Sequence, residues 1–159
     1  MDWFTEQWIQ YNKQEDEYRS LRQPEQDYPA SFGCSFTYGT GVEMEQTWSF
    51  LLDCVNLGVR GASNDYISRM AVTYCKLYNP KDIYVMWTFP NRREYVDDSG
   101  TLLKYKAYDP GSEKYAWHRA NFELSNTYSD NYNLTKNKLL LESFCKSENI
   151  KLHQTSVDT

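Results

Sequence analysis

The sequence lacks an apolar stretch that could cross a membrane. A membrane-spanning helix takes about 20 consecutive, mostly apolar residues, and no run in this chain approaches that length. The N-terminus, MDWFTE, also lacks the basic start and apolar core of an export signal. We therefore expect a cytoplasmic protein that does not associate with membranes.

An excess of basic charge is missing as well. The chain has 17 Lys and Arg against 22 Asp and Glu, which gives a net charge of −5 and a pI near 5.1. A chain with this balance has no general attraction to phosphate backbones or anionic lipids. We expect no nucleic-acid partner.

Cysteine is scarce and scattered. Cys34, Cys54, Cys75 and Cys145 form no CxxC pair and no cluster with histidine, so neither a zinc site nor a disulfide framework is indicated. Free thiols in a reducing compartment are the simpler expectation. The stretch GCSFTYGTG at 33–41 fits neither the dinucleotide pattern GxGxxG nor the phosphate-binding P-loop. We therefore expect neither a metal nor a cofactor.

Aromatic residues, by contrast, are abundant, at 16% of the chain with 14 Tyr and 5 Trp. In residues 2–23, Phe4, Trp8 and Tyr11 recur at helical spacing among polar side chains, which predicts an amphipathic helix. The prolines that follow indicate a linker. The helix is expected to be an arm that packs on the domain or, alternatively, a helix that binds a partner.

The rest of the chain alternates between strand and helix patterns. Short apolar runs predict four strands, at 30–35, 55–59, 83–89 and 150–155. Helices are predicted between them, at 47–52, 64–78, 115–122 and 132–149. Strands joined by crossover helices form a parallel sheet with right-handed connections. The prediction is an α/β fold, a three-layer α/β/α sandwich, with strand 83–89 central and covered on both faces.

This pattern divides the chain into two parts. Residues 1–29 form the N-terminal amphipathic helix and linker, and residues 30–159 form the α/β domain. Within that domain, residues 91–131 lack a clean period and contain the turn signals DDSG and DPG. We expect an insertion there, with some helix near 115–122.

Ser35 is the leading candidate for a catalytic residue. It follows the first predicted strand and lies between Gly33 and Gly39, which permit a tight turn. A serine nucleophile needs such a turn and backbone N–H groups directed at the oxyanion. A simple turn or helix cap would look the same. In parallel sheets, chemistry takes place at the carboxyl ends of strands, so Ser35, residues 58–65 and residues 88–93 are expected to share one edge.

Two blocks resemble those of the SGNH/GDSL hydrolases. GCSFTYG at 33–39 is similar to the block that carries the nucleophile, and NLGVRGASND at 56–65 is similar to the second block. The resemblance implies a flavodoxin-like sandwich, with Ser35 as nucleophile and Gly61 as a backbone donor to the oxyanion. It further implies that Asn91 donates its side-chain amide there, while a turn-forming Pro-Asn pair is the alternative.

Other polar residues near these blocks have two interpretations each. Arg92 or Arg93 could face the pocket and bind an anionic group instead of lying in solvent. Asn64 or Asp65 is predicted to cap the helix that starts there. For Asn64, a polar contact behind the site is the lesser alternative.

The chain departs from the family pattern in two places. Cys34 stands where the family usually has Asp, which is not the proton-transfer base. The family's C-terminal Asp-x-x-His block, whose His takes the proton of the serine, has no match, because neither His118 nor His153 follows an Asp by three residues. A surface or packing role is favoured for His118 and a strand position for His153. We expect a C-terminally incomplete fold or a relative that has lost hydrolysis.

Two functions follow from these observations. The first is an SGNH-like serine hydrolase that acts on a small-molecule or glycan ester, with Ser35, Gly61 and Asn91 as its site residues. The alternative is a non-catalytic carbohydrate- or protein-binding or assembly protein on the same scaffold, favoured by the aromatic surplus and the missing base.

Overall fold

The computed structural model describes residues 19–20, 22–99, 102–105 and 116–157. The predicted N-terminal helix at 2–23 falls mostly outside these ranges, and its described part, from residue 19 on, is not helical. No helix of the described residues is long and apolar enough to cross a bilayer.

The centre of the fold is a four-stranded parallel sheet in the order β2-β1-β3-β6. Its strands are β1 (Ala30–Phe32), β2 (Val55–Asn56), β3 (Asp82–Trp87) and β6 (Lys151–Ser156). All four predicted strands are present, although β1 and β2 are shorter than predicted. The ladder nevertheless continues past β2, because the Val59 N–H donates to the carbonyl of Gly33 at 3.0 Å.

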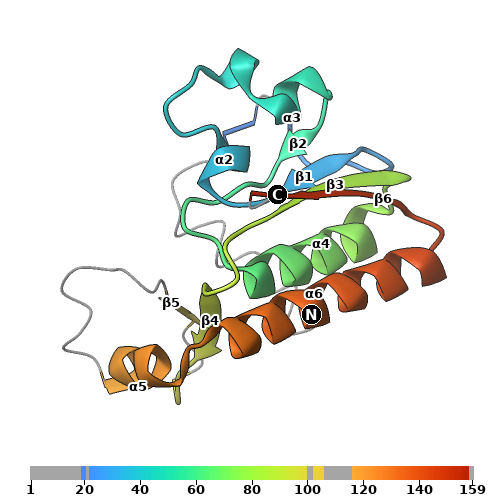
Figure 1. Cartoon of the computed structure of the whole chain (residues 1–159). Helices are drawn as coiled ribbons and strands as arrows, with labels where there is room; N and C mark the ends of the chain where they lie inside the picture. Colours follow the sequence, from blue (N-terminus) through green and yellow to red (C-terminus); the bar gives the residue numbers. More distant parts are fainter. Residues whose placement is uncertain (1–18, 21, 100–101, 106–115, 158–159) are drawn as a thin grey trace.

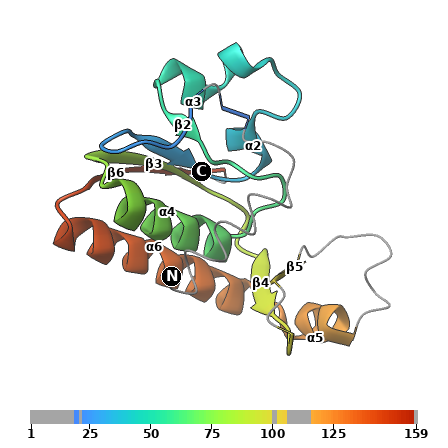
Figure 2. The ribbon, with the colours of Figure 1, turned by 180° about the vertical axis from the view of Figure 1, so that it is seen from behind.

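Helices cover both faces of the sheet, as Figures 1 and 2 show. The short helices α2 (Ser35–Tyr38) and α3 (Trp48–Leu51) lie on one side, with the 3-10 turn η1 (Met44–Gln46) between them in the chain. The long helices α4 (Asn64–Tyr78) and α6 (Thr127–Ser147) lie on the other. The predicted three-layer, flavodoxin-like α/β/α architecture is confirmed.

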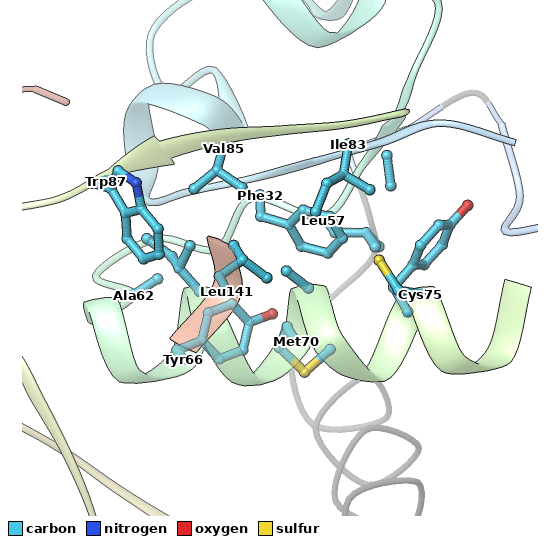
Figure 3. Packing of buried hydrophobic residues seen from close by; sticks show 14 of the residues in the cluster. Phe32, Leu57, Ala62, Tyr66, Met70, Cys75, Ile83, Val85, Trp87 and Leu141 are labelled. Carbon is cyan, nitrogen blue, oxygen red and sulfur yellow. The ribbon is translucent and has the colours of Figure 1, made fainter. Parts of the chain in front are cut away.

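The hydrophobic core fills the space between the sheet and the two long helices. Figure 3 shows Phe32, Val85 and Trp87 of the sheet directed toward Tyr66 and Met70 of α4. All of these side chains are at most 2% exposed. Burial of such apolar surface is the main source of stability for the domain.

Strand β3 is covered less evenly than predicted. Ile83, Val85 and Trp87 are buried against the long helices, whereas Tyr84 and Met86 on the opposite face are only half-buried. The expectation of full coverage on both faces was wrong, because the four-residue helix α3 is too short to cover that whole face. Trp48 and Leu52 therefore border an open groove beside Tyr84.

The long helices begin and end at clear signals. Ser63 caps α4 by accepting a hydrogen bond from the N–H of Tyr66 at 3.0 Å. Asn79, in the left-handed region at φ 48°, ends the helix. Helix α6 begins at Thr127, five residues before its predicted start, because the side chain of Asn126 accepts from the N–H of Ser129.

The segment between β3 and α6 contains an antiparallel hairpin that the sequence did not indicate. It consists of β4 (Arg93–Val96) and β5 (Leu102–Tyr105), and α5 (Ala116–Leu124) follows it. Figures 1 and 2 place this group beside the start of α6. The helix predicted near 115–122 corresponds to α5.

All four cysteines are buried and free. Burial raises the pKa of the Cys54 and Cys75 thiols to about 12 and that of Cys145 to about 11. These three thiols stay protonated at neutral pH and are therefore poor nucleophiles.

Candidate active site at the carboxyl edge of the sheet

Ser35 lies at the carboxyl end of β1, as the first residue of α2, and is half-buried. The chain turns into α2 within two residues of the strand because Gly33 has no side chain. A Cβ at this position would lie only 1.9 Å from the Thr37 hydroxyl oxygen. Ser35 is thus held on a tight strand-to-helix turn, as a serine nucleophile requires.

The loop after β2 packs directly on this turn. Gly58 touches the backbone of α2 so closely that a Cβ there would lie 2.5 Å from the Tyr38 nitrogen. Asn56 joins the two segments, since its side-chain amide donates to the carbonyl of Thr37 at 2.8 Å and its oxygen accepts from the Gly58 N–H at 3.0 Å. Gly61 lies further along this loop, buried and with φ 76°.

Asn64 ties the second loop to the third. It is fully buried, and its side-chain oxygen accepts from the Thr88 N–H at 2.9 Å while its amide donates to the Thr88 carbonyl at 3.1 Å. The prediction that Asn64 or Asp65 caps α4 was therefore wrong, because Ser63 is the cap. Asn64 instead makes the polar contact given as the lesser alternative, with the backbone of Thr88.

The third loop contains Asn91, in a half-buried turn closed by a hydrogen bond from the Arg92 N–H to the carbonyl of Phe89. Among the residues described, no hydrogen bond joins Asn91 to Ser35, so its role in the oxyanion site stays a prediction.

The two arginines of this loop differ in placement. Arg92 spans the second and third loops, because its guanidinium donates to the Thr88 hydroxyl at 2.8 Å and to the carbonyl of Ala62 at 3.3 Å. Arg93 points instead to α6, where it forms a partly buried ion pair with Asp130 at 2.8 Å. Of the two, only Arg92 lies between the strand-end loops.

Neither histidine is hydrogen-bonded to Ser35 in the described part of the chain. His153 lies on β6, where its Nε2 is 2.9 Å from a carboxylate oxygen of Asp82 and its ring stacks on Tyr84. Asp82 is the first residue of β3, so this pair lies toward the amino edge of the sheet, opposite Ser35.

His118 is buried in α5, at 4% exposure. Figures 1 and 2 place α5 on the side of α4 and α6, whereas α2, which begins with Ser35, lies on the other side of the sheet. Of the two roles favoured from the sequence, its burial agrees with packing and not with a surface position.

A polar network behind the third loop was not predicted. One carboxylate oxygen of Asp65 accepts from the amides of Asn133 and Asn137 at 2.9 and 2.8 Å, and the other accepts from the N–H of Glu94. Arg69 and Glu94 form an almost fully buried ion pair at 3.0 Å. The only sequence signal is that polar side chains recur at i, i+4 on inward faces of α4 and α6.

This network consists of amides, one arginine and two carboxylates. The described residues contain no group of three or more His, Cys, Asp or Glu that could hold a metal ion. Its contacts through Asp65 and Arg69 fix β4 and α6 to α4.

At the carboxyl edge, then, the loop after β2 is tied both to the Ser35 turn and to the loop after β3. Comparisons with protein-family models, curated proteins and solved structures gave no match. The similarity to the SGNH hydrolases consequently depends on the two sequence blocks alone.

Proposed function

We propose that this chain is an SGNH-like serine hydrolase domain that cleaves a small-molecule or glycan ester with Ser35 as nucleophile. The observation that supports it is that the loop after β2 is tied both to the Ser35 turn and to the loop after β3. Asn56 fastens the second loop to α2, and Asn64 fastens it to the third loop. A rigid scaffold of this kind holds a nucleophile and its oxyanion donors in fixed positions.

In the proposed reaction, the Ser35 hydroxyl oxygen attacks the ester carbonyl carbon. The backbone N–H groups of Ser35 and Gly61 and the side-chain amide of Asn91 stabilise the negative charge on the carbonyl oxygen. The tetrahedral intermediate then expels the alcohol and leaves an acyl group on Ser35. Water releases this group as the acid and restores the serine.

The proton of Ser35 needs an acceptor in the first step. His153 is engaged with Asp82 toward the opposite edge of the sheet, and His118 is buried in α5. Since the chain has only these two histidines, we propose that a histidine base, where one is used, comes from a polypeptide segment other than residues 1–159.

The test is fluorophosphonate labelling of the folded chain with and without added imidazole, which can replace a missing histidine base. We expect imidazole to increase labelling, with the label on Ser35 in peptide mass spectrometry. Ser35→Ala should abolish labelling, whereas Ser143→Ala, at an exposed position on α6, should leave it unchanged. A folded chain that is not labelled at Ser35 under either condition would rule out the hydrolase proposal.

A second candidate function is carbohydrate or protein binding without catalysis. It is favoured by exposed aromatic side chains around the start of α6, where Tyr128 is 89% exposed, Tyr132 75% and Phe122 65%. Exposed Tyr rings are common in recognition surfaces. A glycan array and a pull-down with the wild type and a Tyr128→Ala/Tyr132→Ala variant test it, and no variant-sensitive binding to either would exclude it.

A further inference from the structure

Three arginines near the carboxyl edge of the sheet have no acidic partner. Arg19, Arg60 and Arg92 form no ion pair with any residue that the structure describes, whereas three other arginines each pair with a carboxylate at 2.7 to 3.0 Å. The chain as a whole carries a net charge of −5. The positive charge at this edge is therefore a local feature, opposite in sign to the rest of the protein.

Arg60 belongs to the turn that contains Gly61, the proposed oxyanion donor. The N–H of Ala62 donates to the carbonyl of Val59 at 3.0 Å, so Arg60 and Gly61 are the two central residues of this turn. The N–H of Val59 donates in turn to the carbonyl of Gly33, which directly follows β1. Arg60 is thus a chain neighbour of one proposed catalytic group and lies beside the segment that leads to the other.

The Arg60 guanidinium is held by an aromatic ring. It is exposed, and it lies over the ring of Tyr38 at 4.9 Å from the ring centroid. Tyr38 follows Ser35 by three residues on α2, a spacing that brings side chains to the same helix face. Arg19 contacts the same ring at 5.7 Å and donates to the carbonyl of Gly39. A cation over an aromatic face keeps its N–H groups available for oxygen acceptors.

Arg92 adds a second positive charge next to the same turn. It is half-buried, and its guanidinium donates only to neutral acceptors, the Thr88 hydroxyl at 2.8 Å and the Ala62 carbonyl at 3.3 Å. Both bonds come from one terminal nitrogen, so the remaining guanidinium N–H groups have no hydrogen-bond partner among the described residues. A charge withdrawn from water without an opposite charge is unfavourable, and an anion bound nearby would offset that cost.

We propose that the ester substrate carries an anionic oxygen group, a carboxylate or a phosphate, which Arg60 binds while Arg92 adds positive charge beside it. This inference rests on the proposed hydrolase function, because it assigns the substrate class of the same site. The planar fork of a guanidinium matches both kinds of oxyanion. An anionic group held at Arg60 would set the ester next to Gly61, and the local charge would attract such substrates to an otherwise acidic protein.

An NMR titration of the full chain is the test. It uses Ser35→Ala, so that no ester is turned over, and three probes. Monomethyl succinate carries a carboxylate, methyl phosphonoacetate carries a phosphonate, and dimethyl succinate is neutral. We expect the two anionic esters to shift the amide signals of Gly61 and Tyr38, and the neutral diester to bind about fivefold more weakly. Tighter binding of one anionic ester would support the proposal and assign the group as carboxylate or phosphate.

Variants of Arg60 show whether this side chain is responsible. Arg60→Gln should weaken binding of the anionic esters by about fivefold. Arg60→Lys keeps the charge but loses the planar fork, so its affinity should be intermediate. Lys146→Gln removes one positive charge from an exposed position on α6, and this control should leave binding unchanged. The proposal is overturned if the anionic esters are not preferred, or if Arg60→Gln and Lys146→Gln have equal effects.

The result can be separated from that of the hydrolase test, since the titration measures binding and fluorophosphonate labelling measures the reactivity of Ser35. Labelling of Ser35 without a preference for anionic esters would keep the hydrolase proposal and remove this one. Binding that depends on Arg60 in a folded chain without labelling would overturn the substrate assignment and leave Arg60 as the centre of an anion-binding site.

Discussion

Removal of the Asn64 side chain should be one of the most damaging single changes at the carboxyl edge. This residue is fully buried, and it satisfies both the N–H and the carbonyl of Thr88, which is itself only 2% exposed. A buried backbone group left without a partner costs about 1–3 kcal/mol. For two such groups, Asn64→Ala should lower the free energy of unfolding by about 2–6 kcal/mol.

In an Asn64→Asp variant, the loss of stability should depend on pH. The new carboxyl keeps the oxygen that accepts from Thr88 N–H, but its other oxygen faces the carbonyls of Thr88 and Phe89, now 3.1 and 3.4 Å from the Asn64 amide. Burial and these carbonyls favour the protonated acid, so its pKa in the folded state lies above the unfolded value of about 3.9.

The sign of the effect follows from proton binding. Below about pH 4, the acid is protonated in both states and can donate to the carbonyl, so the variant should approach wild-type stability. As the pH rises, the unfolded state loses its proton first, and the stability deficit grows until the folded pKa is passed.

Urea unfolding of both Asn64 variants, measured against the wild type at pH 4 and pH 7, is the assay. Asn131→Ala on the exposed face of α6 is the control and should change stability by less than about 0.5 kcal/mol. Two results would refute the reasoning: a loss below about 1 kcal/mol for Asn64→Ala, or an Asn64→Asp deficit that is the same at both pH values.

Three further predictions follow from packing and burial. Leu141→Ala should lower the free energy of unfolding by about 2–5 kcal/mol, because this side chain is fully buried. Leu140→Ala, at a side chain that is 54% exposed, should lower it by less than about 0.5 kcal/mol. Equal urea midpoints for the two variants would contradict this prediction. Gly58→Ala should displace α2, because the new Cβ would lie 2.5 Å from the backbone nitrogen of Tyr38. Both the melting temperature and the labelling of Ser35 should fall. An unchanged melting temperature would count against this close contact. A thiol reagent such as DTNB should modify Cys75 only after denaturation, because burial raises the pKa of its thiol to about 12; rapid modification of the native protein would show that the site opens.

Periodicity and apolar runs were enough to predict the sheet and its main helices. The strand at β3 and the helix at α4 carry their own signals, since each places apolar residues at the spacing of its structure. Strand β4 of the hairpin has no such sequence signal, because Arg93–Val96 is mostly polar. It is held in place by Asp65 and Arg69 of α4. Contacts of that kind are set by tertiary structure, which local sequence does not encode.

The candidate site was predictable only in part, because some of its contacts are also set by tertiary structure. The carboxyl ends of parallel strands meet at one edge, so Ser35 and the two following loops could be grouped from the sequence. The role of Asn64 depends on a neighbour 24 positions away and could not be read locally. The position of His153 depends on the register of β6 against β3, which no local pattern reveals.

The long connection between β3 and β6 bears on the order of folding. Asp82 pairs with Lys151 and Trp87 with Ser156, so the hairpin, α5 and α6 all lie between two strands that are neighbours in the sheet. Closing a longer loop costs more chain entropy, and contacts distant in sequence form more slowly. We therefore expect β1, α4 and β3, whose pairings span shorter segments, to assemble first. Strand β6 would join last, which leaves the outer edge of β3 briefly open to strands from other molecules during folding.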